Sequence, residues 1–515
     1  MPFLPAQLLI PCLVATLAGA AAPAVPAGAT PTMARPVAPA VGDEPFLADL
    51  AQLTFPDRFQ RAGEAYFSPS GRWIIFQAIP AGATTSNYAM YVARLTRDTR
   101  TGLINGLEEI TEVSPPNSAT TCGWFHPTLP GVVLFGCAQG PLSDDQPPGY
   151  SRDRARYSWS FPREMEIVTR TVPAMVDQEV RDADMKFRIL SRPDVAAAQP
   201  MWHQDGYNAE GSFSADGRVV LHTWMDPETG DADLYARIVE TGEMRPLVTE
   251  EGYDGGPFFS PDGKWICYRS DRRGDNLLQV FVAELAFDDR GLPTGIAREV
   301  QLTDNGSVNW APFWHPSGEY LIYTTSQVGH DNYEVFAMAF DAADPKATEP
   351  VRITDAAGFD GLPVFNARGS LMMWTAQRGQ DVTASGHPSS QLWIARTTST
   401  KPAGLGAAMT TTEAPTPPAG DSPGLGQMRV RFGIMPGNYD DTRTGIDVGG
   451  ATPGGSAANA GIRTGDRLMT WNGTTITDIR HWMGLMMQHE PGDVVKVGVL
   501  RGGETIEIEV TLQAP

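Results

Sequence analysis

The sequence predicts a mainly β protein, a six-bladed β-propeller followed by a small C-terminal α+β domain. Six times, an aromatic residue opens a tight turn that closes on Gly and leads into a short apolar strand. Repeats of roughly 40 to 50 residues that each supply four strands are typical of propeller blades. Residues 398–427 then change to Thr, Ala, Pro and Gly with few apolar side chains, which is typical of a flexible linker between two domains.

The turn of each repeat explains its recurring residue types. In Phe259-Ser-Pro-Asp-Gly263, Pro presets its own φ, Ser can bond the local backbone, and Gly accepts a conformation that side chains resist. The apolar run Trp265-Ile-Cys-Tyr268 follows, so the turn should join the first two strands of a blade. The six aromatic anchors are Phe67, Phe125, Phe213, Phe259, Trp314 and Phe365.

The last repeat is incomplete at its end, and its missing part stands at the start of the chain. In the other blades a fourth strand ends near a Leu-Thr or Ile-Thr pair such as Leu302-Thr303, but none follows Ile394. A matching Leu53-Thr54 precedes the first repeat. We therefore expect the N-terminal segment to complete the last blade and close a propeller over residues 44–397, which removes exposed sheet edges.

The spacing between Phe125 and Phe213 is the longest and must contain an insertion. It includes residues 141–157, which are polar and rich in turn formers, and residues 180–206. We expect both segments to be loops on one face of the disc. Loops of this length are either functional or disordered excursions.

The N-terminal region predicts export. An apolar stretch over residues 4–20 ends in Ala18-Gly-Ala20, the small-x-small form of a cleavage site, although no Lys or Arg precedes it. We expect a signal peptide over residues 1–20, a Pro/Ala-rich linker over 21–43, and a location in the periplasm or cell envelope. The formal charge of −21 argues against nucleic acid and anionic membranes as partners, and no later segment is long enough to span a bilayer.

Two cysteines flank the second hairpin. If Phe125 pairs with Leu134, then Cys122 and Cys137 fall opposite each other, and a cross-strand disulfide is one interpretation. Two reduced core thiols are the other.

Short polar residues stand five positions before the anchor aromatics of five repeats. They could cap the entry into the strand by bonding neighbouring backbone. Alternatively, they ring a polar channel mouth that binds a segment of a partner. These residues are Thr120, Asn208, Asp254, Asn309 and Asp360.

No catalytic constellation is evident in the sequence. His126 and His315 occupy turn positions that other repeats fill with Ser or Asn, and the remaining histidines lack metal-binding spacing. The acidic residues around Gly230 miss the spacing of known calcium loops, so we expect a solvated loop, no metal and no cofactor.

The region 428–515 carries a specific set of motifs, namely Pro453-Gly-Gly-Ser-Ala-Ala-Asn-Ala-Gly461, Gly465-Asp466 and Asn472-Gly473. With them this region resembles a PDZ domain of the bacterial envelope type. The repeats likewise resemble the propeller of TolB and of the tricorn protease, in copies such as Phe259-Ser-Pro-Asp-Gly-Lys-Trp265. The two resemblances together cover nearly all of the chain after the leader.

The PDZ resemblance implies peptide binding, in which a peptide adds a strand to a sheet edge and its C-terminal carboxylate enters a nest of backbone N–H groups. The carboxylate loop would be Arg431-Phe432-Gly433-Ile434, although this loop has no Gly-Leu-Gly. Trp482 and Met486 of the following helix would face the groove, or else belong to an apolar stripe that faces the core.

The sequence thus predicts a non-catalytic exported scaffold that binds proteins or peptides, including C-terminal tails, through a propeller face and a PDZ groove. The alternative is an accessory or degenerate relative of a propeller-containing, tricorn-like peptidase. Such enzymes carry a hydrolase domain beside the propeller, and no segment of this sequence resembles one.

Overall fold

The computed structural model divides the chain into two compact units, one that contains the propeller and one that contains the C-terminal domain together with residues Tyr150–Trp159, and each is described by itself. The expected leader 1–20 and most of the linkers 21–43 and 398–427 lie outside the described residues. The described residues are 32–33, 35–36, 44–138, 142, 149–153, 156–191, 197–275, 277–329, 332–379, 381–383, 386, 388–406, 430, 432–438, 445–451, 454–476, 482, 485–486, 489–502 and 504–513.

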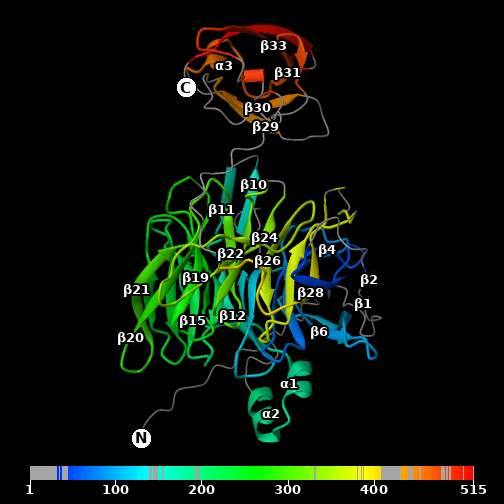
Figure 1. The fold of residues 1–515 in the computed structure, drawn as a ribbon, viewed down its shortest axis with the longest axis vertical. Coiled ribbons are helices and arrows are strands. Elements are labelled where there is room, and N and C mark those ends of the chain that lie inside the picture. The colour runs from blue at the N-terminus through cyan, green and yellow to red at the C-terminus, as the bar shows by residue number, and fades with distance from the viewer. Residues whose placement is uncertain are drawn as a thin grey trace, which may run out of the picture. The chain divides into compact units, whose positions relative to one another are not determined.

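The first unit is a six-bladed β-propeller, which confirms the predicted fold class (Figure 1). Within each blade the strands pair antiparallel in the order of the sequence, except that the outer strand of the last blade comes from the N-terminal segment. Blade 1 contains β4 (Phe59–Phe67), β5 (Trp73–Pro80), β6 (Ala89–Arg97) and β7 (Ile104–Glu112). Blade 2 contains β8 (Ala119–Phe125), β9 (Val132–Ala138), β12 (Glu166–Thr171) and β13 (Gln199–Pro200). Blade 3 contains β14 (Asn208–Phe213), β15 (Val219–Met225), β16 (Ala232–Ile238) and β17 (Met244–Val248).

The remaining blades follow the same order. Blade 4 contains β18 (Asp254–Phe259), β19 (Trp265–Ser270), β20 (Gln279–Phe287) and β21 (Pro293–Gln301). Blade 5 contains β22 (Asn309–Trp314), β23 (Tyr320–Thr325), β24 (Glu334–Ala339) and β25 (Val351–Arg352). Blade 6 contains β26 (Asp360–Phe365), β27 (Leu371–Ala376), β28 (Gln391–Thr397) and the N-terminal strand β3 (Leu47–Gln52). Two-residue strands β1 (Thr32–Met33) and β2 (Arg35–Pro36) lie outside β7 and β3.

The ring closes through the pairing of β3 with β28, in which Gln52 lies opposite Trp393. The strand ends at Gln52, and Leu53-Thr54 follows it rather than forming it. The hydroxyl of Thr54 accepts a hydrogen bond from the backbone N–H of Leu392 at 2.8 Å. Thr303 and Thr354 receive the equivalent bond in blades 4 and 5, also at 2.8 Å. The Leu-Thr pairs recur because the hydroxyl binds a backbone N–H at the start of the third strand.

The two insertions leave blade 2 at opposite faces, which corrects the expectation of loops on one face. Because neighbouring strands run antiparallel, the insertion after β9 emerges where the inner strands begin, and the one after β12 emerges where they end. The first contains the hairpin β10 (Gly149–Asp153) and β11 (Arg156–Ser160). The second contains α1 (Pro173–Glu179) and α2 (Ala183–Leu190), and the Asp182 carboxylate caps α2.

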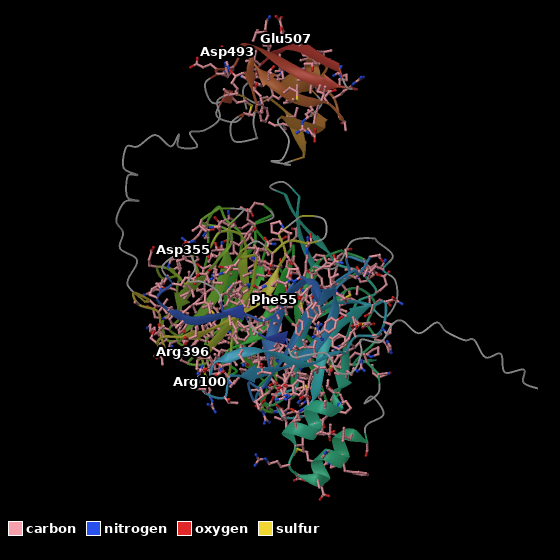
Figure 2. The ribbon with its side chains drawn as sticks, turned by 90° about the vertical axis from the view of Figure 1, so that its right-hand side faces the viewer. Phe55, Arg100, Asp355, Arg396, Asp493 and Glu507 are labelled. Carbon is pink, nitrogen blue, oxygen red and sulfur yellow. The ribbon has the colours of Figure 1, made fainter. Side chains whose placement is uncertain are left out.

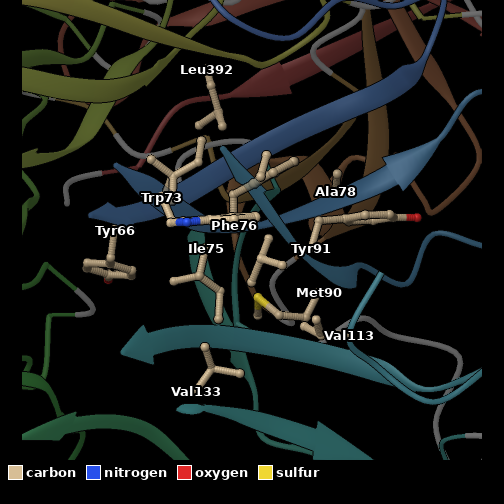
Figure 3. Close-up of a cluster of buried hydrophobic side chains, with 14 of the residues drawn as sticks. Tyr66, Trp73, Ile75, Phe76, Ala78, Met90, Tyr91, Val113, Val133 and Leu392 are labelled. Atoms are coloured by element: carbon tan, nitrogen blue, oxygen red, sulfur yellow. The ribbon is translucent and has the colours of Figure 1, made fainter. Parts of the chain in front are cut away.

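The propeller core lies between adjacent sheets, where apolar strands of one blade pack on the next. Figure 3 shows one such cluster, in which Ile75 and Met90 of blade 1 lie beside Val133 of blade 2. Charged side chains such as Arg100 and Arg396 lie on the outside (Figure 2). Among the described residues, no helix has the length and apolar character that crossing a membrane requires.

The C-terminal domain is an antiparallel sheet with short helices. Its strands follow the order β29 (Ile434–Asn438), β30 (Ile446–Ala451), β31 (Arg467–Trp471), β33 (Val494–Arg501) and β34 (Glu504–Thr511), and β32 (Thr474–Thr475) pairs with β31. A short helix α3 (Ser456–Asn459) follows β30. Trp471, Trp482 and Val497 belong to its separate hydrophobic core. The domain therefore has a core of its own.

Candidate functional site

An open sheet edge marks the first candidate site, in the C-terminal domain. Strand β29 is the last strand of its sheet and, within the described residues, pairs only with β30. Ile434 lies opposite Ala451, and the register shifts on both sides of Pro436. The outer edge of β29 therefore offers backbone groups to an added strand.

A backbone hydrogen bond to α3 holds the loop before β29 in place. The carbonyl of Phe432 accepts a hydrogen bond from the N–H of Ala457 in α3 at 2.8 Å. Gly433 follows with a φ of 79°, a conformation that a β-branched residue strongly resists. Arg431, which the sequence places in the carboxylate loop, lies outside the described residues. The loop thus depends on Gly433 for its path into β29.

The two helix residues predicted to face the groove lie in the core of the domain. Trp482 is 4% exposed and Met486 3%, and Phe432 is 2% exposed. The ring centroids of Phe432 and Trp482 are 5.4 Å apart. Their burial thus agrees with the interpretation that these residues belong to an apolar stripe facing the core.

Two half-buried apolar residues at the border of this core are Ile434 and Leu485. Ile434 belonged to the predicted groove, whereas sequence reasoning missed Leu485. The signal for Leu485 was its spacing of three from Trp482, which places both on neighbouring positions of one helix face.

The motif residues of the C-terminal domain build its turns. Gly461, Gly465, Asn472 and Gly473 all have a positive φ, between 48° and 88°. The Asp466 carboxylate is buried and binds Nε and Nη2 of Arg501, each at 2.6 Å. These residues therefore hold the scaffold of the domain.

The five polar residues predicted at the propeller mouth are 0% to 3% exposed, so they do not ring a solvent-filled opening. Three of them bond neighbouring backbone, as the capping interpretation expects. Thr120 donates to the carbonyl of Tyr88 at 3.0 Å. Asn208 donates to the carbonyl of Gln204 at 3.0 Å, and Asn309 donates to that of Ser307 at 3.1 Å.

The two aspartates of this set form buried ion pairs. Asp254 lies 3.1 Å from Nη2 of Arg272, and Asp360 lies 2.5 Å from Nη2 of Arg378. Burial raises the pKa of Asp254 to about 6 and that of Asp360 to about 7, against the opposing effect of each arginine. Both aspartates therefore help to hold the propeller together.

The predicted disulfide between Cys122 and Cys137 is wrong, because both residues are free thiols. Phe125 pairs with Val133 rather than Leu134, and the residue opposite Cys137 is Thr120. A bulge between Thr121 and Trp124 shifts Cys122 out of the ladder.

The bulge of blade 2 is one of six at equivalent places on the inner strands. Each lies three positions before an anchor aromatic and carries a residue with φ between 44° and 62°. Sequence reasoning missed these positions, although the constant spacing from the anchor was a usable signal. The six residues are Glu64, Cys122, Glu210, Gly256, Ala311 and Leu362.

The C-terminal domain and the propeller are similar to different known proteins. Residues 424–512 match the family model described as PDZ domain. The periplasmic pH-dependent serine endoprotease DegQ of Escherichia coli is 36% identical over 72 residues, which are 14% of this chain and 16% of DegQ. The serine protease Do-like HtrA of Lactobacillus helveticus is 34% identical over 71 residues, 14% of this chain and 17% of that protein. The chain thus spans less than a fifth of the length of these two relatives.

The propeller is similar to solved structures at low sequence identity. TolB from Acinetobacter baumannii aligns with 63% of this chain and 80% of its own, at 15% identity and a TM-score of 0.32.

Proposed function

We propose that this protein is a non-catalytic exported scaffold whose C-terminal domain binds the C-terminal segment of a partner by strand addition to β29. The observation that carries the proposal is the open edge of β29, which starts directly after the left-handed Gly433. An added peptide strand gains main-chain hydrogen bonds along the edge, and its side chains gain contacts with the residues beside the edge.

The match of residues 424–512 to the PDZ domain family supports this proposal, because PDZ domains bind peptides in this way. The half-buried Ile434 and Leu485 supply an apolar border for a side chain of the peptide. Export is part of the proposal because the relative DegQ is named as periplasmic and the sequence predicts a leader over residues 1–20.

The alternative function is that of an accessory or degenerate relative of a propeller-containing, tricorn-like peptidase. It is favoured by one observation: two relatives, each similar to about 14% of this chain, are named as serine proteases. A peptidase assay on the purified chain, with and without a serine-protease inhibitor, tests it. Inhibitor-sensitive cleavage would contradict the non-catalytic scaffold.

A library of peptides with free C-termini, screened on the full chain, tests the binding proposal. We expect enrichment of a C-terminal motif and at least tenfold weaker binding after Gly433→Val, because Val resists the left-handed loop that leads into β29. Leu485→Glu should weaken binding similarly by placing a charge at the apolar border.

The control is Ile508→Glu, since Ile508 is equally half-buried against the same core but lies on β34. It should leave the motif and its affinity unchanged. Equal binding by all variants, or no enriched motif, would overturn the proposal.

A further inference from the structure

The axis of the propeller contains a cluster of ionisable side chains that the C-terminal groove does not use. Its geometry starts from two adjacent glycines of β18. A Cβ atom at Gly255 would collide with the hydroxyl of Tyr253, and one at Gly256 would collide with the guanidinium of Arg269. Because these positions carry no side chain, Tyr253 and Arg269 fill the place that the bulge residue holds in the other blades.

Glu210, the bulge residue of blade 3, is fully engaged by this pair. Its carboxylate accepts hydrogen bonds from the Tyr253 hydroxyl at 2.8 Å and from the N–H of Gly256 at 2.5 Å. Nη2 of Arg269 lies 3.1 Å from Glu210 and 2.6 Å from the Tyr253 hydroxyl. The negative charge of Glu210 and the positive charge of Arg269 therefore neutralise each other.

Among the described residues, the hydrogen-bond partners of Glu64, the bulge residue of blade 1, are neutral groups, and the backbone N–H of Cys122 is one of them. The Glu64 carboxylate also accepts from the thiol of Cys122 and from the hydroxyl of Tyr66 at 3.4 Å. Burial raises the pKa values of Cys122 and Tyr66 well above their usual ranges, so both partners stay uncharged. Burial also raises the pKa of Glu64; Arg269 acts to lower it and Glu210 to raise it. Two carboxyl groups thus face one guanidinium, so a cation bound beside Glu64 would act against the effect of burial and favour its ionised form.

Glu64 is also within reach of solvent. It is half-buried, as are Cys122 and Leu362 at the same level of the neighbouring inner strands. The backbone N–H of Glu64 donates to Thr375 of blade 6 at 3.0 Å, which fixes its position at the closure of the ring. A ligand that enters along the axis can therefore meet this carboxylate.

Aromatic rings occupy the axis two residues further along the same strands. Tyr66, Trp124, Phe258 and Phe313 come from four different blades, yet their ring centroids lie 4.9 to 6.4 Å apart. Side chains from four blades can meet in this way only at the axis. Aromatic faces attract cations and give no hydrogen bonds to an anion.

We propose that the propeller axis binds a primary ammonium group, with the Glu64 carboxylate as its counter-ion and the aromatic cluster as its apolar floor. The excess of one carboxyl group selects a cation, and the thiol, hydroxyl and aromatic neighbours suit an ammonium on an alkyl stem. A free alkylamine and the side chain of a lysine share this chemistry.

Calorimetric titration of the full chain tests the proposal with two probes, n-butylammonium chloride and a blocked tripeptide whose central residue is lysine. Binding of either probe supports the site, and the comparison identifies its source as a free amine or a protein lysine. The same tripeptide with acetylated lysine should not bind, because it lacks the charge. Failure of both probes to bind would overturn the proposal.

Glu64→Gln should weaken binding at least tenfold, because it removes the counter-ion at nearly constant size. The matched control is Glu109→Gln, since Glu109 also has a left-handed backbone, with φ of 51° against 44° for Glu64, but lies on the outer strand β7. Unchanged affinity in Glu64→Gln, or equal losses in both variants, would contradict a role for the axial carboxylate.

A second variant leaves Glu64 in place. Leu362→Lys puts a tethered ammonium on the neighbouring blade and should compete with both probes, whereas Leu362→Met should not. If Leu362→Lys binds the probes as tightly as wild type, the site lies elsewhere. The outcome is independent of the peptide groove, which Gly433→Val tests separately.

Discussion

Arg378 and Glu44 are joined by an ion pair of 2.5 Å between Nη2 and Oε1, although 334 positions separate them in the chain. The same guanidinium binds Asp360, and all three side chains are at most 5% exposed. The cluster ties the residues just before β3 to blade 6. It therefore adds a buried electrostatic contact to the strand pairing that closes the ring.

Arg378→Met should destabilise the propeller strongly, because it leaves two buried carboxylates without their cation. We expect a loss of about 3 to 5 kcal/mol in the free energy of unfolding, measured by urea denaturation. Arg396→Met is the control, since Arg396 also links blade 6 to β3 through Asp49 but its side chain is 50% exposed. That change should cost less than about 1 kcal/mol. Equal effects would show that the buried cluster does not secure the closure.

The threonines of the Leu-Thr pairs should contribute alike in different blades. Thr54→Val, Thr303→Val and Thr354→Val each leave a buried backbone N–H without its acceptor, so each should cost about 1 to 3 kcal/mol of stability. Thr99→Val in an exposed turn serves as the control. Thermal melts of the four variants provide the measurement. If Thr54→Val melts like Thr99→Val, the N-terminal pair does not repeat the role of the others.

The parts of the fold that depend on local residue chemistry could be predicted from the sequence. The anchor turns and the Leu-Thr pairs are local chemistry, a turn that needs Gly and a hydroxyl that binds a backbone N–H, so they predict blades and closure from sequence. The bulges carry no residue signature, because residues as different as Glu64 and Leu362 hold the same left-handed conformation, and only their constant spacing from the anchor marks them. The bulge in turn explains the error at Cys122, whose pairing cannot be counted from the turn.

The candidate sites likewise combine features that local sequence patterns predict with features that depend on contacts between distant residues. The family motifs predict a carboxylate loop at Gly433, whose positive φ agrees with a need for glycine there. Helical periodicity identifies an apolar face around Trp482 but does not say which part of it is buried in the core. The axial cluster depends on Arg269 crossing over Gly256, a contact between two strands that no local pattern in the chain indicates.

Asp233 should make stability depend on pH. Burial, followed by the nearby Asp231 and Asp254, raises its pKa from the ordinary 3.8 to about 6. A carboxyl with a raised pKa stabilises the folded state fully below about pH 4 and loses that contribution as the pH rises through 6. Asp233→Asn should therefore raise the melting temperature at pH 7.5 and have a shrinking effect toward pH 4. Asp289→Asn is the control because Asp289 is exposed, and it should leave the melting temperature unchanged at both pH values. A constant difference across this range would contradict the assignment.

The thiols should all be reactive once the chain is unfolded. Cys122, Cys137 and Cys267 are free, so iodoacetamide in denaturant should label all three without any reductant, as measured by mass spectrometry of their peptides. In the native protein, Cys137 and Cys267 should resist labelling because they are buried. If Cys122 and Cys137 are labelled only after a reductant is added, the two residues form a disulfide and the assignment as free thiols is wrong.

Hydrogen–deuterium exchange on the full chain tests strand addition to β29 most directly, with the peptide enriched from the library as ligand. An added strand gives new hydrogen bonds to the outward-facing backbone N–H groups of Ile434–Asn438, among which Pro436 has none, so these amides should exchange more slowly in the complex. Exposed strand positions of β34 should exchange unchanged. Protection confined to the propeller, or no change over Ile434–Asn438 at saturating peptide, would contradict the account.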